Sequence, residues 1–232
     1  MGVAILVFWV VMLTLLIKKV NFANQQPTAD QGLAATAVEG AQREWKEIYF
    51  GEQKAGFAVS LIKPFGGGYF IRDETFLKLD LMGMGGGLYA STQAQVDERF
   101  ILKSFSLVMT SGVVRYKVSG RIEHDVLLIE AGKGEKNRRI KLNKPPMLGA
   151  TMNQSFKSRR FKVGESFRLP LFDPSTMAQK DAVVRVIAKE SIRIHTIRYD
   201  ALRLEVEFWG KPITIWVDEE GKTLKEAGAK ET

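Results

Sequence analysis

The sequence predicts a mainly β domain: a strongly curved antiparallel sheet, half-barrel or barrel-like, with a short helical insertion and one preceding transmembrane helix. Three observations lead to this fold class. Apolar and polar residues alternate with a period of two over most of the chain after Arg43, glycine-containing turns separate these stretches, and helical periodicity is scarce. The 232 residues include 21 glycines and 7 prolines, which suits one folded body with many hairpins.

The N-terminal segment predicts a membrane anchor over residues 1–23. Residues 2–17 read GVAILVFWVVMLTLLI and carry no charge. At about 1.5 Å per residue, a helix of this length is slightly shorter than the roughly 30 Å hydrocarbon layer. Lys18 and Lys19 extend its reach, because their ammonium groups can lie among the headgroups. A cleaved signal peptide is the alternative, but no basic residues precede the run and no clear small-x-small site follows it.

Residues 24–42 are predicted to be a flexible linker, and residues 43–228 the β-rich globular domain. The linker is polar and rich in small residues, without a strong period. Lys18 and Lys19 follow the uncharged run 2–17, so the positive-inside rule taken alone places the domain in the cytoplasm. Two lysines are a small signal for the orientation of the anchor. A translation start further upstream that adds basic residues before the anchor would reverse the predicted orientation.

The predicted strands fall into two groups. The first group is a continuous meander over 44–50, 57–65, 69–82, 88–100, 102–109, 113–122 and 126–131. The second group covers 166–171, 182–194, 196–209, 212–217 and 222–226. Within 196–209 the alternation changes phase by one residue near Ala201, which indicates a β-bulge or a bend.

A short helix is predicted between residues 145 and 161, where the alternation stops. Met147, Leu148, Met152 and Phe156 are expected to face the interior. A long meander of curved strands with one helical insertion predicts a bent sheet whose concave face must be filled.

The sequence predicts no enzyme, no metal site and no cofactor. Cysteine is absent, so disulfides, thiolate metal sites and cysteine nucleophiles are excluded. The only two histidines, His124 and His195, have no second imidazole or carboxylate cluster at ligand spacing, and each is expected in a turn. No G-x-S-x-G or P-loop motif occurs, and the glycine runs at 66–68 and 83–87 lie between strands. An enzyme with a carboxylate site that lacks a motif remains an alternative.

The basic segment, residues 133–162, contains ten basic residues and one acid, a net charge of +9 in a chain of net charge +8. It predicts contact with anionic lipid headgroups, at about 1 kcal/mol per residue near a charged surface; a solvated loop is an equal alternative. Nucleic acid is not expected, because no aromatic stacking platform accompanies the charge. The expected headgroup contacts are Lys136, Arg138, Arg139, Lys141, Lys157, Arg159, Arg160 and Lys162.

Three motifs occur in order along the chain: WKEIYFGEQKAGF at 45–57, VGESF at 163–167 with FDP at 172–174, and IWVDEEGKTLKE at 215–226. Together they resemble an uncharacterised bacterial envelope module found ahead of transglutaminase-like domains and similar to the DUF3108-type β-rich secreted families. The resemblance implies an exported domain in the periplasm, with the half-barrel of bacterial lipoprotein-carrier proteins as an expected architecture. It carries over no catalytic residue, since a cysteine-histidine-aspartate hydrolase needs a cysteine.

The expected function is binding of an apolar ligand, a lipid or acyl chain, by a periplasmic domain anchored in the inner membrane. The expected ligand-binding residues are the aromatics Phe76, Phe105 and Phe208, assigned to the inward phases of their strands; plain core positions are the alternative. The alternative function is a protein-interaction scaffold with a filled core. It presents an edge strand or the basic face to a separately encoded transglutaminase-like or other envelope enzyme.

Overall fold

The computed structural model describes residues 38–50, 53–81, 84–131, 137–157, 159–208 and 210–228. The predicted anchor over 1–23 and most of the predicted linker lie outside these residues. Within the described ranges, no helix combines the length and apolar character needed to cross a membrane.

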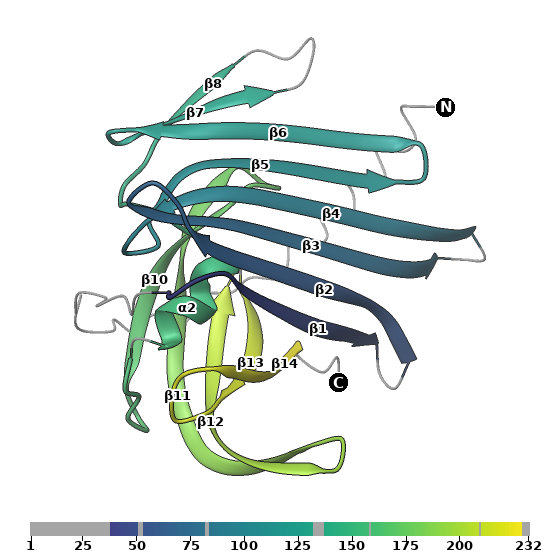
Figure 1. Cartoon of the computed structure of the whole chain (residues 1–232), viewed down its shortest axis with the longest axis vertical. Coiled ribbons are helices and arrows are strands. Elements are labelled where there is room, and N and C mark those ends of the chain that lie inside the picture. Colours follow the sequence, from purple (N-terminus) through teal and green to yellow (C-terminus); the bar gives the residue numbers. More distant parts are fainter. Residues whose placement is uncertain are drawn as a thin grey trace.

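The first half of the domain is an eight-stranded antiparallel sheet, arranged as a meander in chain order (Figure 1). Its strands are β1 (Gln42–Phe50), β2 (Gln53–Pro64), β3 (Gly68–Leu81), β4 (Met84–Asp97), β5 (Leu102–Ser111), β6 (Val114–Glu123), β7 (Val126–Ala131) and β8 (Arg138–Lys141). The prediction of a continuous meander over this part of the chain is confirmed.

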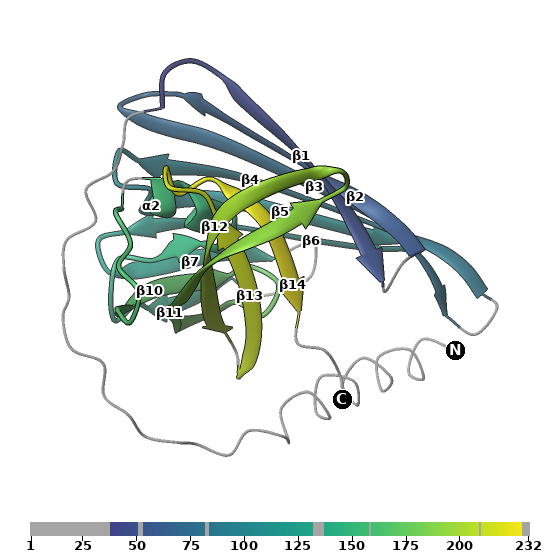
Figure 2. The same ribbon diagram turned by 90° about the horizontal axis from the view of Figure 1, so that it is seen from below.

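The second half forms a separate six-stranded sheet that curls beneath the first (Figure 2). In spatial order its strands are β14 (Thr223–Gly228), β13 (Lys211–Val217), β12 (Ile197–Phe208), β11 (Ala178–Ile194), β10 (Ser166–Asp173) and β9 (Met147–Leu148). All neighbours are antiparallel except β9, which is parallel to β10. The predicted mainly β, antiparallel class is confirmed, and the predicted curved half-barrel is found in the six-stranded sheet. The strands nevertheless form two sheets and not one, since among the described residues no strand pairs with strands of both sheets.

The short helical insertion is confirmed. A 3-10 turn, η1 (Gly149–Thr151), leads into α2 (Met152–Lys157), between β9 and β10. Met147, Leu148 and Phe156 are buried, and Met152 packs against the core, as predicted. These side chains point toward the core cluster that lies between the two sheets.

The core fills the space between the two sheets. On the eight-stranded sheet, Ile71, Ala94 and Phe105 lie in register across β3, β4 and β5 and are all buried. The residues of the six-stranded sheet with no exposed surface are Met147, Leu169, Ala182, Val184, Leu204, Ile215 and Val217. Alternating residues of the two inner faces therefore make one continuous apolar core, as in packed sheets generally.

The bend predicted near Ala201 exists, but it originates on the facing strand. The register of β11 against β12 shifts between Val186 and Ala188, so that Ile187 is the extra residue of a bulge opposite Arg203 and Leu204. Bulges bend and twist a strand, and Figure 1 shows β11 and β12 curving strongly. The phase change in the sequence of β12 reflects this irregularity in its neighbour.

Both histidines lie in hairpin turns with left-handed backbone, as predicted for turn residues. His124 has a φ of 59° between β6 and β7, and His195 a φ of 52° between β11 and β12. In the turn after β10, Asp173 Oδ1 accepts a hydrogen bond from the Ser175 backbone N–H at 2.8 Å.

Candidate functional site: an aromatic groove

The strand register gathers aromatic side chains on the outer face of β1–β4. Phe57 on β2 is paired with Phe76 on β3, and Phe76 with Tyr89 on β4. Trp45 on β1 is opposite Val59, which makes it a diagonal neighbour of Phe57. Directly paired and diagonal residues on one sheet face are close enough for aromatic side chains to touch. We call these four residues the aromatic row.

Ring contacts join three members of the aromatic row. The ring centroids of Trp45 and Phe57 are 5.9 Å apart, and those of Phe57 and Phe76 are stacked at 5.7 Å. All four side chains are nevertheless exposed, Trp45 by 67% and Phe57, Phe76 and Tyr89 by 37–40%. Apolar side chains that cluster on a surface instead of scattering over it mark an interaction site.

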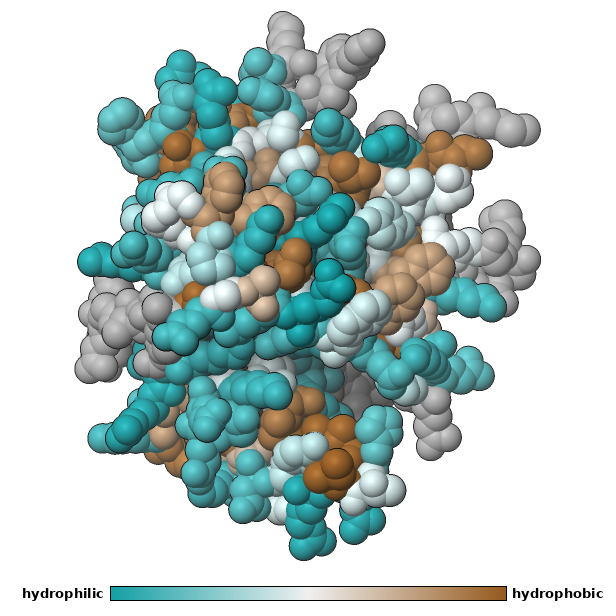
Figure 3. Space-filling view, viewed as in Figure 1, coloured by the Kyte–Doolittle hydropathy of each residue, from teal (hydrophilic) through white to brown (hydrophobic). Residues whose placement is uncertain are grey.

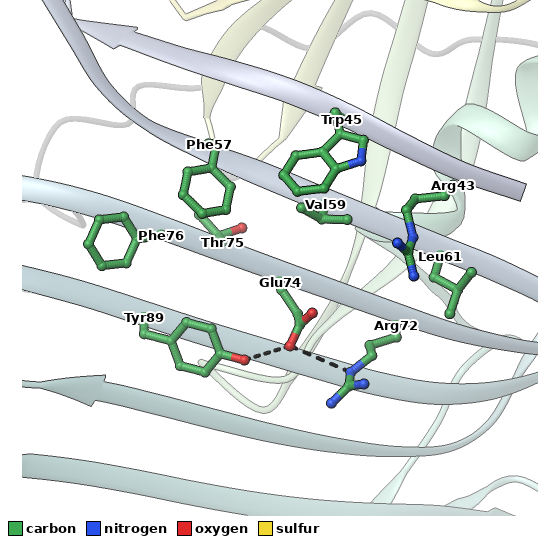
Figure 4. Close-up of a pocket in the computed structure, with 10 residues that line it drawn as sticks. All are labelled: Arg43, Trp45, Phe57, Val59, Leu61, Arg72, Glu74, Thr75, Phe76 and Tyr89. Carbon is green, nitrogen blue, oxygen red and sulfur yellow. Dashed lines mark hydrogen bonds and ion pairs between the residues drawn. The ribbon is translucent and has the colours of Figure 1, made fainter.

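The row lies in an open groove of about 420 Å³ (Figure 4). Its lining is Arg43, Trp45, Phe57, Val59, Leu61, Arg72, Glu74, Thr75, Phe76 and Tyr89. A glycine on β4 helps to leave room for the rings, because a Cβ at Gly87 would lie 3.4 Å from the Phe76 ring. In the space-filling view, apolar side chains lie interspersed with hydrophilic ones across this side of the molecule (Figure 3).

Charged groups flank the aromatic row. Glu74 accepts a hydrogen bond from the Tyr89 hydroxyl at 2.6 Å and pairs with Arg72 Nε at 3.6 Å. The hydrogen bond to Glu74 is the main reason that the pKa of Tyr89 is raised above its ordinary value of 10.0. Arg43 is exposed at the other end and has no ion pair among the described residues. The groove therefore offers aromatic surface together with a free cation.

A second polar cluster lies on the inner face of the same strands, where it ties β1 to α2 and β14. Lys157 of α2 pairs with Glu44 at 3.1 Å, and Lys46 forms an ion pair with Glu226. Within the described part of the chain, no group of three or more potential ligands could hold a metal ion. The two ion pairs join β1 of the eight-stranded sheet to α2 and to β14 of the six-stranded sheet, so the cluster is a structural junction.

Asp73 lies beside this junction and accepts a hydrogen bond from the Ser60 hydroxyl. Burial raises its pKa above the ordinary value of 3.8, and the hydrogen bond from Ser60 opposes that rise. The ionised form of Asp73 is thus disfavoured by its surroundings in the folded protein.

The three predicted ligand-binding residues do not come together. Phe105 is buried in the core, 5.3 Å from the Phe172 ring, and Phe208 packs against the core. Phe76 does not point inward as expected, because the inward phase of β3 is that of Ile71 and Asp73. The inward phase of β3 includes the carboxylate of Asp73, whereas the outward phase contains Phe70 and Phe76 together with Arg72 and Glu74, so polarity does not distinguish the two faces. Phe76 is the one of the three that lines the groove.

The predicted headgroup contacts on the edge strand β8 are available to solvent. Arg138, Arg139 and Lys141 are exposed, and Lys141 lies 3.9 Å from Asp125. Lys136 is outside the described residues. These cations lie at the edge of the sheet opposite to β1.

The remaining predicted contacts lie around α2, and two of them have structural partners. Lys157 belongs to the inner junction, and Arg159 covers the Phe167 ring, its guanidinium carbon 3.9 Å from the ring centroid. Arg160 and Lys162 are exposed. The basic segment is therefore divided between two locations.

Trp45, Phe57 and Tyr89 were missed by the sequence analysis. The signal was present, because Trp45 and Phe57 flank the first hairpin and Phe57, Phe76 and Tyr89 share one phase of successive strands. Recognising them requires the register of four strands, and this depends on where each turn begins.

No protein-family model matches the sequence, and the search of the curated proteins gave no significant match. The fold is similar to a β-barrel-like protein of domain of unknown function DUF1849 from Brucella abortus, with a TM-score of 0.49 and 11% identity over 75% of this chain and 88% of that one. A DUF1089 family protein from Pseudomonas aeruginosa matches with a TM-score of 0.37 and 10% identity over 88% and 97% of the two chains. The assignment of a site therefore depends on this chain's own residues.

Proposed function

We propose that this chain is a non-catalytic, membrane-anchored domain of the bacterial cell envelope that docks a polypeptide partner on the aromatic groove. The observation that carries the proposal is the aromatic row, in which four neighbouring rings are exposed on one sheet face. Tryptophan, tyrosine and arginine are the residue types that dominate the energetics of protein interfaces. The lining of the groove contains all three of these residue types.

The groove fits an extended segment with apolar side chains. Its rings lie along the face of a sheet and remain open to solvent, so an occupant is covered from one side only. A partner protein can shield the other side with its own body, whereas a single acyl chain would leave that side in water.

Core packing also supports this choice over the lipid-carrier function. Phe105 and Phe208, expected to line a ligand cavity, are packed in or against the core. The inner-membrane anchor and the periplasmic location remain part of the proposal; they derive from the hydropathy of residues 2–17 and from the resemblance to DUF3108-type envelope modules. A separately encoded transglutaminase-like or other envelope enzyme is the expected class of partner.

Lipid binding is a second candidate function, favoured by one observation. Arg138, Arg139 and Lys141 are exposed on β8, and Arg160 and Lys162 are exposed beside α2. Cations on a tethered domain are attracted to anionic headgroups. This contact would hold the domain near the bilayer without using the groove.

Photo-crosslinking in the native cells tests the proposal. A benzoylphenylalanine in place of Phe76 should capture one protein, and the same group in place of Val113, which is fully exposed in the β5–β6 turn, should not. The adduct should disappear in the Trp45→Ser background, because that change removes the most exposed ring of the row. Lipid adducts at Phe76, or equal capture from both positions, would refute the docking of a polypeptide.

A further inference from the structure

β1 (Gln42–Phe50) forms one edge of the eight-stranded sheet, and its only strand partner in the described part of the chain is β2. Figure 1 shows it along the lower margin of this sheet. The free side of an edge strand presents N–H and C=O groups to which another strand can bind. Charged side chains usually oppose such pairing, so the charges of β1 determine which strand can pair with this edge.

The charges of β1 are antisymmetric about Trp45. Glu44 and Lys46 flank this residue with opposite signs, and Arg43 and Glu47 do the same one position further out. When two such strands run antiparallel with both copies of Trp45 opposite each other, every charge meets its opposite. Arg43 faces Glu47 of the second copy, and Glu44 faces Lys46 of the second copy.

We propose that a second copy of this chain pairs with β1 in this register, giving an antiparallel homodimer with one continuous sheet. The two-fold axis passes through Trp45, and each of the two opposite-charge pairs occurs twice. Opposite charges that face each other across strands stabilise a sheet, and like charges destabilise it. The dimer goes beyond the proposed function, because it forms without the docked partner.

Neighbouring registers are excluded by the same charges. Residues opposite each other must face the same side of the sheet, so the axis has to pass through a residue. An axis at Lys46 places two lysines opposite each other, and an axis at Glu44 places two glutamates opposite each other. The other edge strand, β8, carries Arg138, Arg139 and Lys141 without an acid, so two copies of β8 would repel.

The exposed side of the interface lies on the outer face of the sheet. Arg43, Trp45 and Glu47 are all exposed there. Arg43 has no ion pair among the described residues, whereas Glu47 pairs with Lys54 and accepts a hydrogen bond from the Tyr49 hydroxyl at 2.6 Å. Glu44 and Lys46 are half-buried on the inner face, where each also has an ion-pair partner. Because Arg43 is the charge of β1 without an ion-pair partner in the described part of the chain, the Arg43–Glu47 pairs contribute most of the charge specificity. The two Trp45 rings meet at the axis, so the aromatic rows of both copies become one longer row across the dimer.

Charge exchange tests the dimer. Sedimentation equilibrium of the full chain in a density-matched non-ionic detergent should show a dimer. Arg43→Glu should raise the dissociation constant of the dimer by about tenfold, because both Arg43–Glu47 pairs change from attraction to repulsion. The double variant Arg43→Glu/Glu47→Arg should restore the dimer, since the pairs are exchanged but remain opposite in sign. A monomeric wild type, or a dimer that Arg43→Glu leaves unchanged, would overturn the proposal.

Cysteine chemistry tests the register, because the natural chain has no cysteine. Trp45→Cys should form an intermolecular disulfide on mild oxidation, since residues at the axis have Cβ atoms about 5 Å apart. Glu47→Cys should not, because its two copies are offset by four residues, roughly 13 Å along the strand. The opposite result places the axis elsewhere and rejects this register. Phe57→Ser, tested with the crosslinker at position 76, should abolish partner capture and leave the dimer intact, so the dimer and the proposed function fail independently.

Discussion

Removing the Phe156 ring should reveal how strongly α2 holds the two sheets together. Phe156 is fully buried, and its ring makes edge contacts with Phe161 at 5.7 Å and with Phe167 at 6.4 Å. A Phe→Ala substitution in a protein core lowers the free energy of unfolding by about 3–5 kcal/mol, because apolar burial is lost and a cavity is left behind. The two ring contacts, worth about 0.5–1.5 kcal/mol each, place this site in the upper half of that range.

A loss of about 4 kcal/mol is a large part of the roughly 5–15 kcal/mol that stabilises a typical domain. Equilibrium unfolding of the full chain in urea, with detergent present and tryptophan fluorescence as the signal, measures it. With a slope of about 2–3 kcal/mol/M, the midpoint should fall by roughly 1.5–2 M while the slope stays constant.

Two further variants make this measurement specific. Phe156→Leu keeps most of the apolar burial and loses the ring contacts, so it should cost about 1–2 kcal/mol. Phe65→Ala, at a side chain 54% exposed, should change stability by less than about 0.5 kcal/mol. If Phe156→Ala cost no more than Phe65→Ala, α2 would not be part of the core and the described packing would be refuted.

Three other predictions follow from the packing. Burial raises the pKa of Asp73 above 3.8, so ionisation of Asp73 destabilises the folded protein at higher pH. The free energy of unfolding should therefore increase as the pH falls through the raised pKa toward 3.8. Asp73→Asn, which retains an acceptor for Ser60, should remove this rise and stabilise the protein at neutral pH, as measured by urea unfolding at several pH values. Gly221→Ala should cost about 3 kcal/mol or more, measured as a fall in the urea midpoint. Its φ is +77° and the new Cβ would lie 2.2 Å from the Phe156 carbonyl oxygen. Trp45→Ser should change the free energy of unfolding by less than about 1 kcal/mol, as its side chain is largely exposed.

Each of these predictions has a clear contrary result. An Asp73→Asn variant with the wild-type pH profile would show that Asp73 is not the group that titrates in this range. A Gly221→Ala variant as stable as the wild type would contradict the close approach of this turn to α2. A large loss of stability in Trp45→Ser would mean that the ring is structural, and loss of partner capture in that variant would then not identify a docking surface.

The strands and turns followed from the sequence because their causes are local. Alternation in 102–109 and 113–122, with a turn between them, is sufficient for a hairpin, and the structure has one there. The helical insertion followed in the same way, from the loss of alternation before Phe156. His124 and His195 were correctly placed in turns, because each lies between two alternating runs.

The aromatic groove did not follow, because alternation defines two faces of a strand but not which face is covered. On β3, the apolar character of Phe76 predicts an inward position, yet the inward phase contains Asp73 and Phe76 is exposed on the outer face. A partly buried carboxylate is compatible with the interior when a neighbouring strand supplies a hydrogen-bond donor. For Asp73 this donor is the Ser60 hydroxyl on β2.

By itself, the sequence determined the mainly β class, the order of the hairpins, the absence of cysteine chemistry and the apolar N-terminal run. Only the tertiary structure decided that the strands divide into two sheets, that Phe105 is core, and that Trp45, Phe57, Phe76 and Tyr89 share an exposed face. The physical reason is the range of the interactions. Backbone preference and alternation act over a few residues, whereas the choice of the buried face depends on a second sheet about 100 residues away along the chain.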